Sequence, residues 1–360
     1  MLMTRRTLGV ALVATMALGS AQAVLAQQAA AAPPNVVILA TGGTIAGAAA
    51  TGTQSGYTSG AVTIDAMLKA VPGIDKLATV KGEQISNVGS QDMSFDILLK
   101  VAKRINELAK DPKVAGFVIT HGTDTMEESA FFLNLTVKTD KPVVLVGSMR
   151  PSTAVSADGP LNLYNAVGIA VDPAAKGRGV MVVLNDQIHA AHSITKTSTT
   201  SVETFQSPVR GILGTASYGK NDWYQSPGWK HTSKSEFDIS NVTKLPRVDI
   251  VFAGVDASPD MITLAANAGA KGIVIAGVGN GNMTKAMVDA ASAAVKKGVV
   301  VVRASRVPTG LVGRNVELDD DKLGFIASDE LNPQKARILL ALSLLKQRSP
   351  ADLQNLYRAY

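Results

Sequence analysis

The chain of 360 residues contains no cysteine. Disulfide bonds, thiolate nucleophiles and cysteine metal sites are therefore excluded. Histidine is scarce, with four in the whole chain. Only His189 and His192 have a spacing that metal ligands could use, and no acidic cluster accompanies them. We therefore expect loop histidines and no metal site.

Long runs of like charge are missing as well. The chain has 35 Lys and Arg against 29 Asp and Glu, a net charge of +6, and no run of four basic residues. This mild balance favours solubility over nucleic-acid binding. The two glycine-rich phosphate-binding patterns and the G-x-S-x-G nucleophile elbow do not occur. Candidate nucleophiles are therefore Ser, Thr, Lys, Asp and Glu.

The only long apolar segment lies at the start of the chain. An arginine pair precedes an apolar run over 8–18, and small residues lead up to Ala23 and Ala26. This order is typical of a secretory signal peptide. The run is shorter than the ~20 residues of a membrane span. The arginine pair fits the twin-arginine route as well as the Sec route. We predict that 1–26 is removed, that 27–34 is a spacer, and that the protein is exported to a bacterial periplasm.

Short apolar segments dominate the rest of the chain. Continuous apolarity in Val- and Ile-rich runs predicts strands that are buried on both faces, as in a parallel sheet covered by helices. The expected strands are 35–40, 114–120, 142–146, 179–184, 248–253, 272–276 and 299–302. Helical periodicity is found at 94–110, 126–137, 161–171, 260–268 and 284–297. A last helix, capped by Asn332 and running to Lys346, is expected to close the chain.

The alternation of strands and helices predicts an α/β protein. Apolar periodicity disappears over 219–247, where prolines and scattered charges are found instead. We expect a large N-terminal domain over 35–222, with a doubly wound, flavodoxin-like, mostly parallel sheet. A linker over 223–246 is expected to lead to a smaller C-terminal α/β domain over 247–360.

Polar residues follow the first two of these predicted strands. Ligands of open α/β sheets bind beyond the carboxyl ends of the strands. Thr44 comes after two glycines, which allow a sharp bend and close substrate approach. Thr123 and Asp124 follow the next predicted strand. Both hydroxyls could instead lie at helix starts, and spacing alone leaves this open. Loop 47–60, with the lone aromatic Tyr57, is a candidate lid or an ordinary surface loop.

Ordered motifs resemble those of bacterial L-asparaginases. The run 38–47 resembles their first signature, and 119–125 resembles their second. Further matches follow in chain order at 89–92, 146–151, 195–197, 279–282, 305–310 and 331–337. The exported type II and glutaminase-asparaginase group is the most similar.

This resemblance implies a hydrolase that converts L-asparagine to L-aspartate and ammonia through a threonine acyl-enzyme, without cofactor or metal. An L-glutaminase side activity stays open. Gln91 stands where glutaminase-type relatives often carry Glu, which favours asparagine. This preference is weak, because the one methylene by which glutamine exceeds asparagine is worth only ~1–3 kcal/mol of discrimination. The catalytic residues that it implies are Thr44, Tyr57, Thr123, Asp124, Lys196 and Glu317. The substrate-binding residues that it implies are Gly43, Ser90, Gln91, Thr123, Asp124, Asn282 and Glu317.

The resemblance also implies an assembly. Asn282 and Glu317 match positions that a neighbouring subunit contributes, in a homotetramer built as a dimer of dimers. Thr284 departs from an aromatic residue of some relatives, so the wall formed by that subunit is expected to differ. Neither a nucleic acid nor, after signal removal, a membrane is an expected partner. The alternative from another class is a periplasmic amino-acid-binding protein without turnover.

Overall fold

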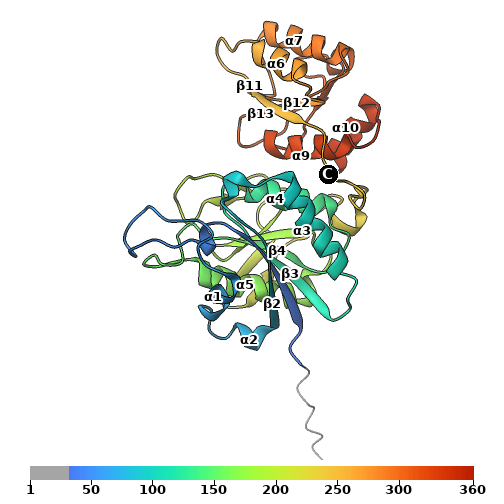
Figure 1. The fold of residues 1–360 in the computed structure, drawn as a ribbon. Coiled ribbons are helices and arrows are strands. Elements are labelled where there is room, and N and C mark those ends of the chain that lie inside the picture. Colours follow the sequence, from blue (N-terminus) through green and yellow to red (C-terminus); the bar gives the residue numbers. More distant parts are fainter. Residues whose placement is uncertain (1–31) are drawn as a thin grey trace, which may run out of the picture. The chain divides into compact units, whose positions relative to one another are not determined.

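The computed structural model describes residues 32–360, in which a large sheet of eight strands, a small sheet of four strands, a pair of short strands and their helices form the fold (Figure 1). The predicted signal peptide and residues 27–31 of the predicted spacer lie outside the described residues. Within residues 32–360, no helix has both the length and the apolar character needed to cross a bilayer.

The large sheet has eight strands in the order β10-β9-β6-β5-β4-β3-β1-β2. Their bounds are β1 Asn35–Gly42, β2 Thr79–Val88, β3 Val114–Thr120, β4 Val143–Val146, β5 Val180–Leu184, β6 Gln187–Ala190, β9 Gly214–Ser217 and β10 Lys220–Trp223. The first five are parallel in the order 2-1-3-4-5, which is the flavodoxin-like order. Strands β6, β9 and β10 extend the sheet antiparallel. The predicted mostly parallel sheet is therefore confirmed.

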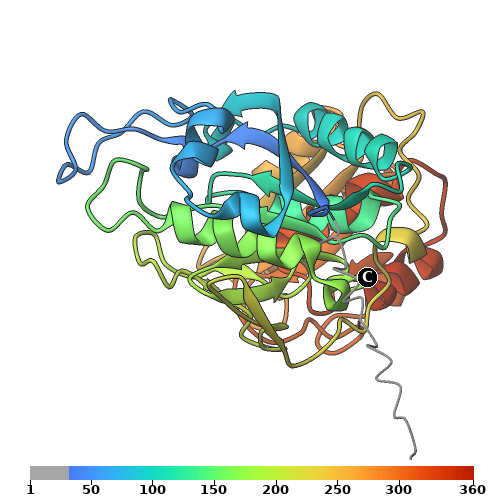
Figure 2. The same ribbon diagram turned by 90° about the horizontal axis from the view of Figure 1, so that it is seen from below.

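Both faces of the large sheet are covered, which explains the continuous apolar runs (Figures 1 and 2). On β1, Val36 and Ile38 belong to one buried cluster, whereas Val37 and Leu39 belong to another. The first cluster includes helices α1 Ile64–Lys69, α2 Ile74–Leu77 and α5 Gly159–Val171; the second includes α3 Phe95–Leu108 and α4 Met126–Thr136. Alternate side chains thus enter opposite cores, and neither face of the central strands meets water.

The small sheet has four parallel strands in the order β11-β12-β13-β14. Their bounds are β11 Val248–Phe252, β12 Gly272–Gly277, β13 Val300–Ser305 and β14 Phe325–Ala327. Helices α6 Asp260–Asn267 and α7 Lys285–Lys296 cover one face, and α9 Pro333–Ser343 covers the other (Figure 1). Helix α9 also packs against α4, so the C-terminal part of the chain lies against the large sheet's helical layer.

All seven predicted strands and all the predicted helices are present, with bounds shifted by a few residues. One expectation was wrong: the chain does not end with the helix after Asn332. Another helix, α10 Pro350–Ala359, follows and begins with a Ser349 capping box. Other elements had no prediction because they are short or, like β2, only partly buried: α8 Asp320–Leu323, β7 Thr195–Lys196 and β8 Phe205–Gln206.

The stretch without periodicity is well packed. Strand β10 occupies its start and joins the large sheet. Phe237 and Ile239 are buried further along, and the Phe237 ring lies 5.2 Å from the ring of Tyr360. Irregular backbone that buries side chains gives no periodic pattern, so the sequence showed only the loss of periodicity. The predicted linker bounds of 223–246 remain a prediction.

Candidate active site

Two loops meet where the order of the large sheet reverses. Strand β1 pairs with β2 on one side and with β3 on the other, and this switch point is where open α/β sheets bind ligands. Gly43, after β1, has φ +83°, and a Cβ there would lie 2.2 Å from the backbone nitrogen of Gly122 after β3. Only glycine permits this approach. It brings Thr44 and Thr123 to the same edge of the sheet.

Thr44 pairs with the aromatic residue of the predicted lid loop. Its Oγ1 lies 2.7 Å from the Tyr57 hydroxyl, and either atom can donate. Thr44 is buried, whereas Tyr57 is 43% exposed. The loop returns through a bridge between Ala48 and Thr58, and the Tyr57 ring packs closely on Gly47. A buried hydroxyl therefore has a proton-exchanging partner open to solvent.

Thr44 does not cap a helix. It is the first residue of a short 3₁₀ turn, Thr44–Ala46, whose N-cap is Gly43, and no side chain caps it. Helix α4 likewise begins after Thr125, without a capping side chain. Both hydroxyls thus lie close to helix starts, as the alternative predicted, but neither acts as a cap, and their partners are side chains.

Lys196 joins Thr123 and Asp124 in a second group. Its ammonium donates to Thr123 Oγ1 at 2.9 Å and to Asp124 Oδ1 at 2.7 Å. Lys196 comes from the short strand β7, which pairs with β8. The carboxylate is largely exposed and the lysine largely covered. The group therefore offers a hydroxyl, a cation and an open carboxylate side by side.

Ser90 ties the loop after β2 to this group. Its Oγ accepts from the backbone nitrogen of Asp124 at 3.1 Å, and its carbonyl accepts from the hydroxyl of Thr125 at 2.7 Å. Ser90 is buried beside Gly122. The neighbouring Gln91 is exposed and donates to Asp92 at 3.1 Å. The structure thus brings together the predicted positions Gly43, Thr44, Tyr57, Ser90, Gln91, Thr123, Asp124 and Lys196.

Asn282 and Glu317 lie elsewhere, in loops of the small sheet. Asn282 follows β12 and forms a backbone bridge with Val278. Glu317 is exposed. Among the described residues, no hydrogen bond connects either side chain to the group at β1 and β3. One chain therefore does not bring all the predicted site residues together.

A buried ion pair shapes both of these loops. Arg303 in β13 donates to both carboxylate oxygens of Asp320 at 2.6 Å. The same guanidinium donates to the carbonyls of Asn280, Gly281 and Gly313 at 3.0 to 3.3 Å. The loop before Asn282 and the segment before Glu317 are thus held by one side chain. Neither Arg303 nor Asp320 lies in a motif of the resemblance, and no role was predicted for them.

His121 is a second residue whose role the sequence did not show. It lies in the loop after β3, as predicted for the histidines, whereas His189 lies in strand β6 and departs from that prediction. His121 is buried, and its Nδ1 lies 2.6 Å from the carbonyl of Gly122. Because a carbonyl only accepts, Nδ1 carries the proton. Burial lowers the pKa of His121 to about 4, so the ring is neutral at pH 7. It therefore orients the Gly122 peptide without adding charge.

No group of three or more His, Cys, Asp or Glu side chains in residues 32–360 converges as a metal site would. The donor set at the switch point consists of hydroxyls, one ammonium and one carboxylate. This set suits proton transfer in general acid–base chemistry.

Comparison with protein families decides the family. The asparaginase N-terminal family matches residues 35–228, and the glutaminase/asparaginase C-terminal domain matches residues 247–357. The chain belongs to the asparaginase family. The predicted resemblance is thereby confirmed over nearly all of the described residues.

Individual relatives agree. The chain is 52% identical to L-asparaginase 2 of Escherichia coli, covering 91% of this chain and 93% of that protein. It is 50% identical to a glutaminase-asparaginase of Acinetobacter glutaminasificans, covering 91% and 99%, and 51% identical to a protein of Haemophilus influenzae named probable L-asparaginase periplasmic, covering 92% and 94%. The crystal structure of a probable cytoplasmic L-asparaginase from Campylobacter jejuni matches with a TM-score of 0.88 at 47% identity, covering 91% and 100%.

Proposed function

We propose that this asparaginase-family protein hydrolyses L-asparagine to L-aspartate and ammonia. The observation that carries the proposal is the pair of hydroxyl groups at the switch point, Thr44 with Tyr57 and Thr123 with Lys196 and Asp124. Relatives named L-asparaginase and glutaminase-asparaginase support the substrate class. No observation favours an amino-acid-binding protein without turnover.

In the proposed reaction, Thr44 is the nucleophile. Its Oγ1 forms a bond to the side-chain amide carbon as its proton passes to the Tyr57 oxygen, 2.7 Å away, and the Tyr57 hydroxyl in turn releases its own proton toward the leaving nitrogen. The carbon–nitrogen bond then breaks, and the nitrogen takes a proton and leaves as ammonia. Water hydrolyses the resulting ester, which releases L-aspartate and restores the threonine.

Lys196 and Asp124 have separate tasks in this proposal. The ammonium of Lys196 orients the Thr123 hydroxyl and stabilises negative charge that develops near it. Asp124 has an exposed carboxylate that can accept the ammonium of an amino-acid substrate. Ser90, Gln91 and Gly43 complete the cradle with hydroxyl, amide and backbone groups.

We also propose that the site is completed by a second copy of the chain, which supplies Asn282 and Glu317, in a homotetramer built as a dimer of dimers. Their loops lie in the small sheet, and among the described residues no hydrogen bond joins either side chain to the Thr44 group of the same chain, which supports the proposal. Glu317 from a neighbour could orient Tyr57, and with Asp124 could bind the substrate ammonium.

Location and selectivity complete the proposal. An N-terminal segment with signal-peptide character and a relative named periplasmic support export to a periplasm, by the Sec or the twin-arginine route. Similar identity to L-asparaginase 2 and to a glutaminase-asparaginase supports a slower side activity on L-glutamine.

Ammonia release by the purified protein without its signal segment tests the function. We expect release from L-asparagine, slower release from L-glutamine, and a loss of at least ~1,000-fold in kcat for Thr44→Ala. Thr53→Ala, an exposed threonine of the same lid loop, is the matched control and should keep full activity. Binding of asparagine without ammonia release would instead identify an amino-acid-binding protein.

A further inference from the structure

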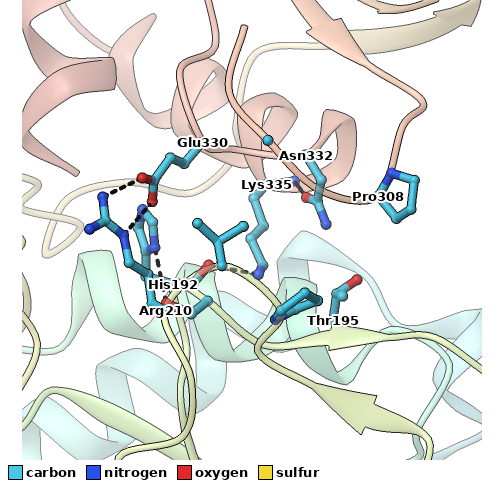
Figure 3. Close-up of a pocket in the computed structure, with 11 residues that line it drawn as sticks. His192, Thr195, Arg210, Pro308, Glu330, Asn332 and Lys335 are labelled. Atoms are coloured by element: carbon cyan, nitrogen blue, oxygen red, sulfur yellow. Dashed lines mark hydrogen bonds and ion pairs between the residues drawn. The ribbon is translucent and has the colours of Figure 1, made fainter. Parts of the chain in front are cut away.

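Lys335 is a buried cation that binds the backbone just before β7, the strand that carries Lys196. It lies in the first turn of α9, in the C-terminal part of the chain, and is 3% exposed. Its ammonium donates to the carbonyl of His192 at 2.8 Å and to the carbonyl of Ile194. These carbonyls lie four and two residues before Lys196. Figure 3 shows Lys335 reaching toward this segment from α9.

A buried carboxylate holds the other side of the same segment. Glu127, in the first turn of α4, is 5% exposed. Its Oε2 accepts from the backbone nitrogen of Lys196 at 3.3 Å, and its Oε1 accepts from Gln334 at 2.7 Å. Gln334 precedes Lys335 in α9. Two helices from distant parts of the chain therefore fix the backbone from His192 to Lys196.

The charges of this scaffold are compensated. Burial lowers the pKa of Lys335 to about 8, and the opposing charge of Glu127 limits this fall. The ammonium is therefore charged at pH 7 and finds backbone carbonyls, as buried cations require. Arg210 and Glu330, which line a cavity together with Lys335, form a further ion pair. A buried charge with fixed partners is costly to displace, which makes such groups suited to holding a segment in one position.

A ligand site is the alternative explanation for this cluster. Figure 3 shows the cluster around a cavity lined by His192, Thr195, Arg210, Glu330 and Lys335. The cavity measures about 40 Å³. Clefts that bind small organic ligands typically measure about 300–1,000 Å³, so this space is too small for such a ligand and suits water instead. Positioning therefore explains the buried groups better than binding.

We propose that Lys335 and Glu127, linked through Gln334, are positioning residues that set the place of the Lys196 ammonium against Thr123 and Asp124. This inference rests on the proposed function, in which Lys196 takes part in the reaction. The two residues touch neither the hydroxyls nor the carboxylate of the site. They act through the backbone of the Lys196 segment, because a reacting side chain must be held within about 0.5 Å of its productive position by the groups that support it.

Steady-state kinetics of Lys335→Met test the proposal. Methionine is close to lysine in length but has no donors, so the segment before Lys196 loses two hydrogen bonds. We expect kcat on L-asparagine to fall ten- to a hundredfold, as displacements near 1 Å do, with KM within about threefold because Ser90 and Asp124 remain in place. Lys138→Met is the matched control. Lys138 follows the C-terminal end of α4 and donates to the carbonyl of Ser235. The kcat of this variant should stay within about twofold of the wild-type value.

The conservative variant separates geometry from charge. Glu127→Gln keeps an acceptor for the Lys196 nitrogen and can bond to Gln334 after that amide turns over, so kcat should stay within about threefold. Glu127→Leu removes both acceptors and should resemble Lys335→Met. If Lys335→Met does not fold, Gln334→Met replaces it, since this partly exposed side chain provides only the link to Glu127. The proposal would be overturned if kcat stayed within about twofold of wild type in Lys335→Met, Gln334→Met and Glu127→Leu, as it should in the Lys138→Met control.

Crystal structures keep this test independent of the proposed function. The distance from Lys196 Nζ to Thr123 Oγ1 is 2.9 Å in the wild-type chain. We expect it to exceed about 4 Å in Lys335→Met or, failing that, in Gln334→Met. If the wild-type protein released no ammonia from any amide, the proposed function would fail, and the displaced ammonium alone would still support the positioning role. An unchanged distance would contradict that role in either case.

Discussion

Two ion pairs, one beside the large sheet and one beside the small sheet, differ in exposure and in role. At the large sheet, Lys196 and Asp124 form a pair whose carboxylate is 61% exposed and whose ammonium also holds a hydroxyl. At the small sheet, Arg303 and Asp320 form a pair that is 1% and 0% exposed, and the guanidinium is saturated by backbone carbonyls. The open pair remains available to a substrate, whereas the closed pair can only fix the loops around it.

This contrast separates chemistry from architecture. An exposed ion pair contributes little to stability because water screens it, so a role in substrate chemistry explains the Lys196–Asp124 pair better than a role in folding. A buried pair is costly to break because each lone charge would remain without water. The loops that carry Asn282 and Glu317 are thus shaped by a pair that cannot itself react. The following predictions test this contrast.

The largest effect on stability is expected at the small sheet. Arg303→Met leaves Asp320 buried without its partner, so the free energy of unfolding should fall by about 3–5 kcal/mol. Arg104→Met is the control, because Arg104 also binds a carboxylate with two donors, those of Glu83, but at a partly exposed position. Urea unfolding of both variants measures the difference. Equal losses would show that burial of the pair does not matter.

The next effect concerns the reaction. Tyr57→Phe removes the hydroxyl that lies 2.7 Å from Thr44 while keeping the ring against Gly47. We expect kcat for ammonia release to fall by about 10²-fold or more, with an unchanged unfolding midpoint. Tyr218→Phe, at an exposed turn of the large sheet, is the matched control. A kcat within twofold of wild type would exclude Tyr57 from proton transfer.

Acid should weaken the fold through buried histidines. Burial lowers the pKa of His121 and of His189 to about 4, below the usual value near 6.5. Between these values the unfolded chain binds protons that the folded chain does not, so the free energy of unfolding falls as the pH drops from about 6.5 to about 4. Each histidine contributes a slope of up to about 1.4 kcal/mol per pH unit.

Urea titrations at several pH values measure this slope. His189→Gln should make it shallower by about one proton, since glutamine does not titrate and can still bond to Ser207. The variant leaves His121 at the site unchanged. An identical slope in both proteins would assign the acid sensitivity to groups other than His189.

The smallest effect on stability is expected at the open pair. Asp124→Asn should change the free energy of unfolding by less than about 1 kcal/mol, because the carboxylate is largely in water. Its KM for L-asparagine should nevertheless rise, since the proposed acceptor of the substrate ammonium has lost its charge. Urea unfolding and steady-state kinetics on the same preparation check both parts. If the free energy of unfolding fell by several kcal/mol, the exposed pair would stabilise the fold as the buried pair does, and the contrast would fail.

The sequence predicted most of the parallel strands because burial on both faces leaves a continuous apolar run. It also predicted Thr44 and Thr123 as site candidates, because both follow strands of an open α/β sheet, whose carboxyl ends bind ligands. Strands such as β6 and β9 were missed because four residues at a sheet's antiparallel margin give no pattern.

The positioning groups could not be predicted from local pattern. Lys335 meets carbonyls more than 140 residues away, and carbonyls have no sequence signature. One signal was nevertheless present: Glu127 and Lys335 are charged residues within otherwise buried helical stretches, where charge requires a partner. The identity of that partner depends on the tertiary fold alone.

Trapping the covalent intermediate tests most directly that Thr44 carries the reaction. The protein is mixed with L-asparagine, quenched in acid within the first turnover and digested with trypsin. Cleavage at Lys69, Lys113 and Lys138 places Thr44 and Thr123 on different peptides. We predict one added aspartyl group on Thr44 in the wild-type protein and none in Thr44→Ala. An aspartyl group on Thr123, or turnover without any adduct on Thr44, would contradict the proposed mechanism.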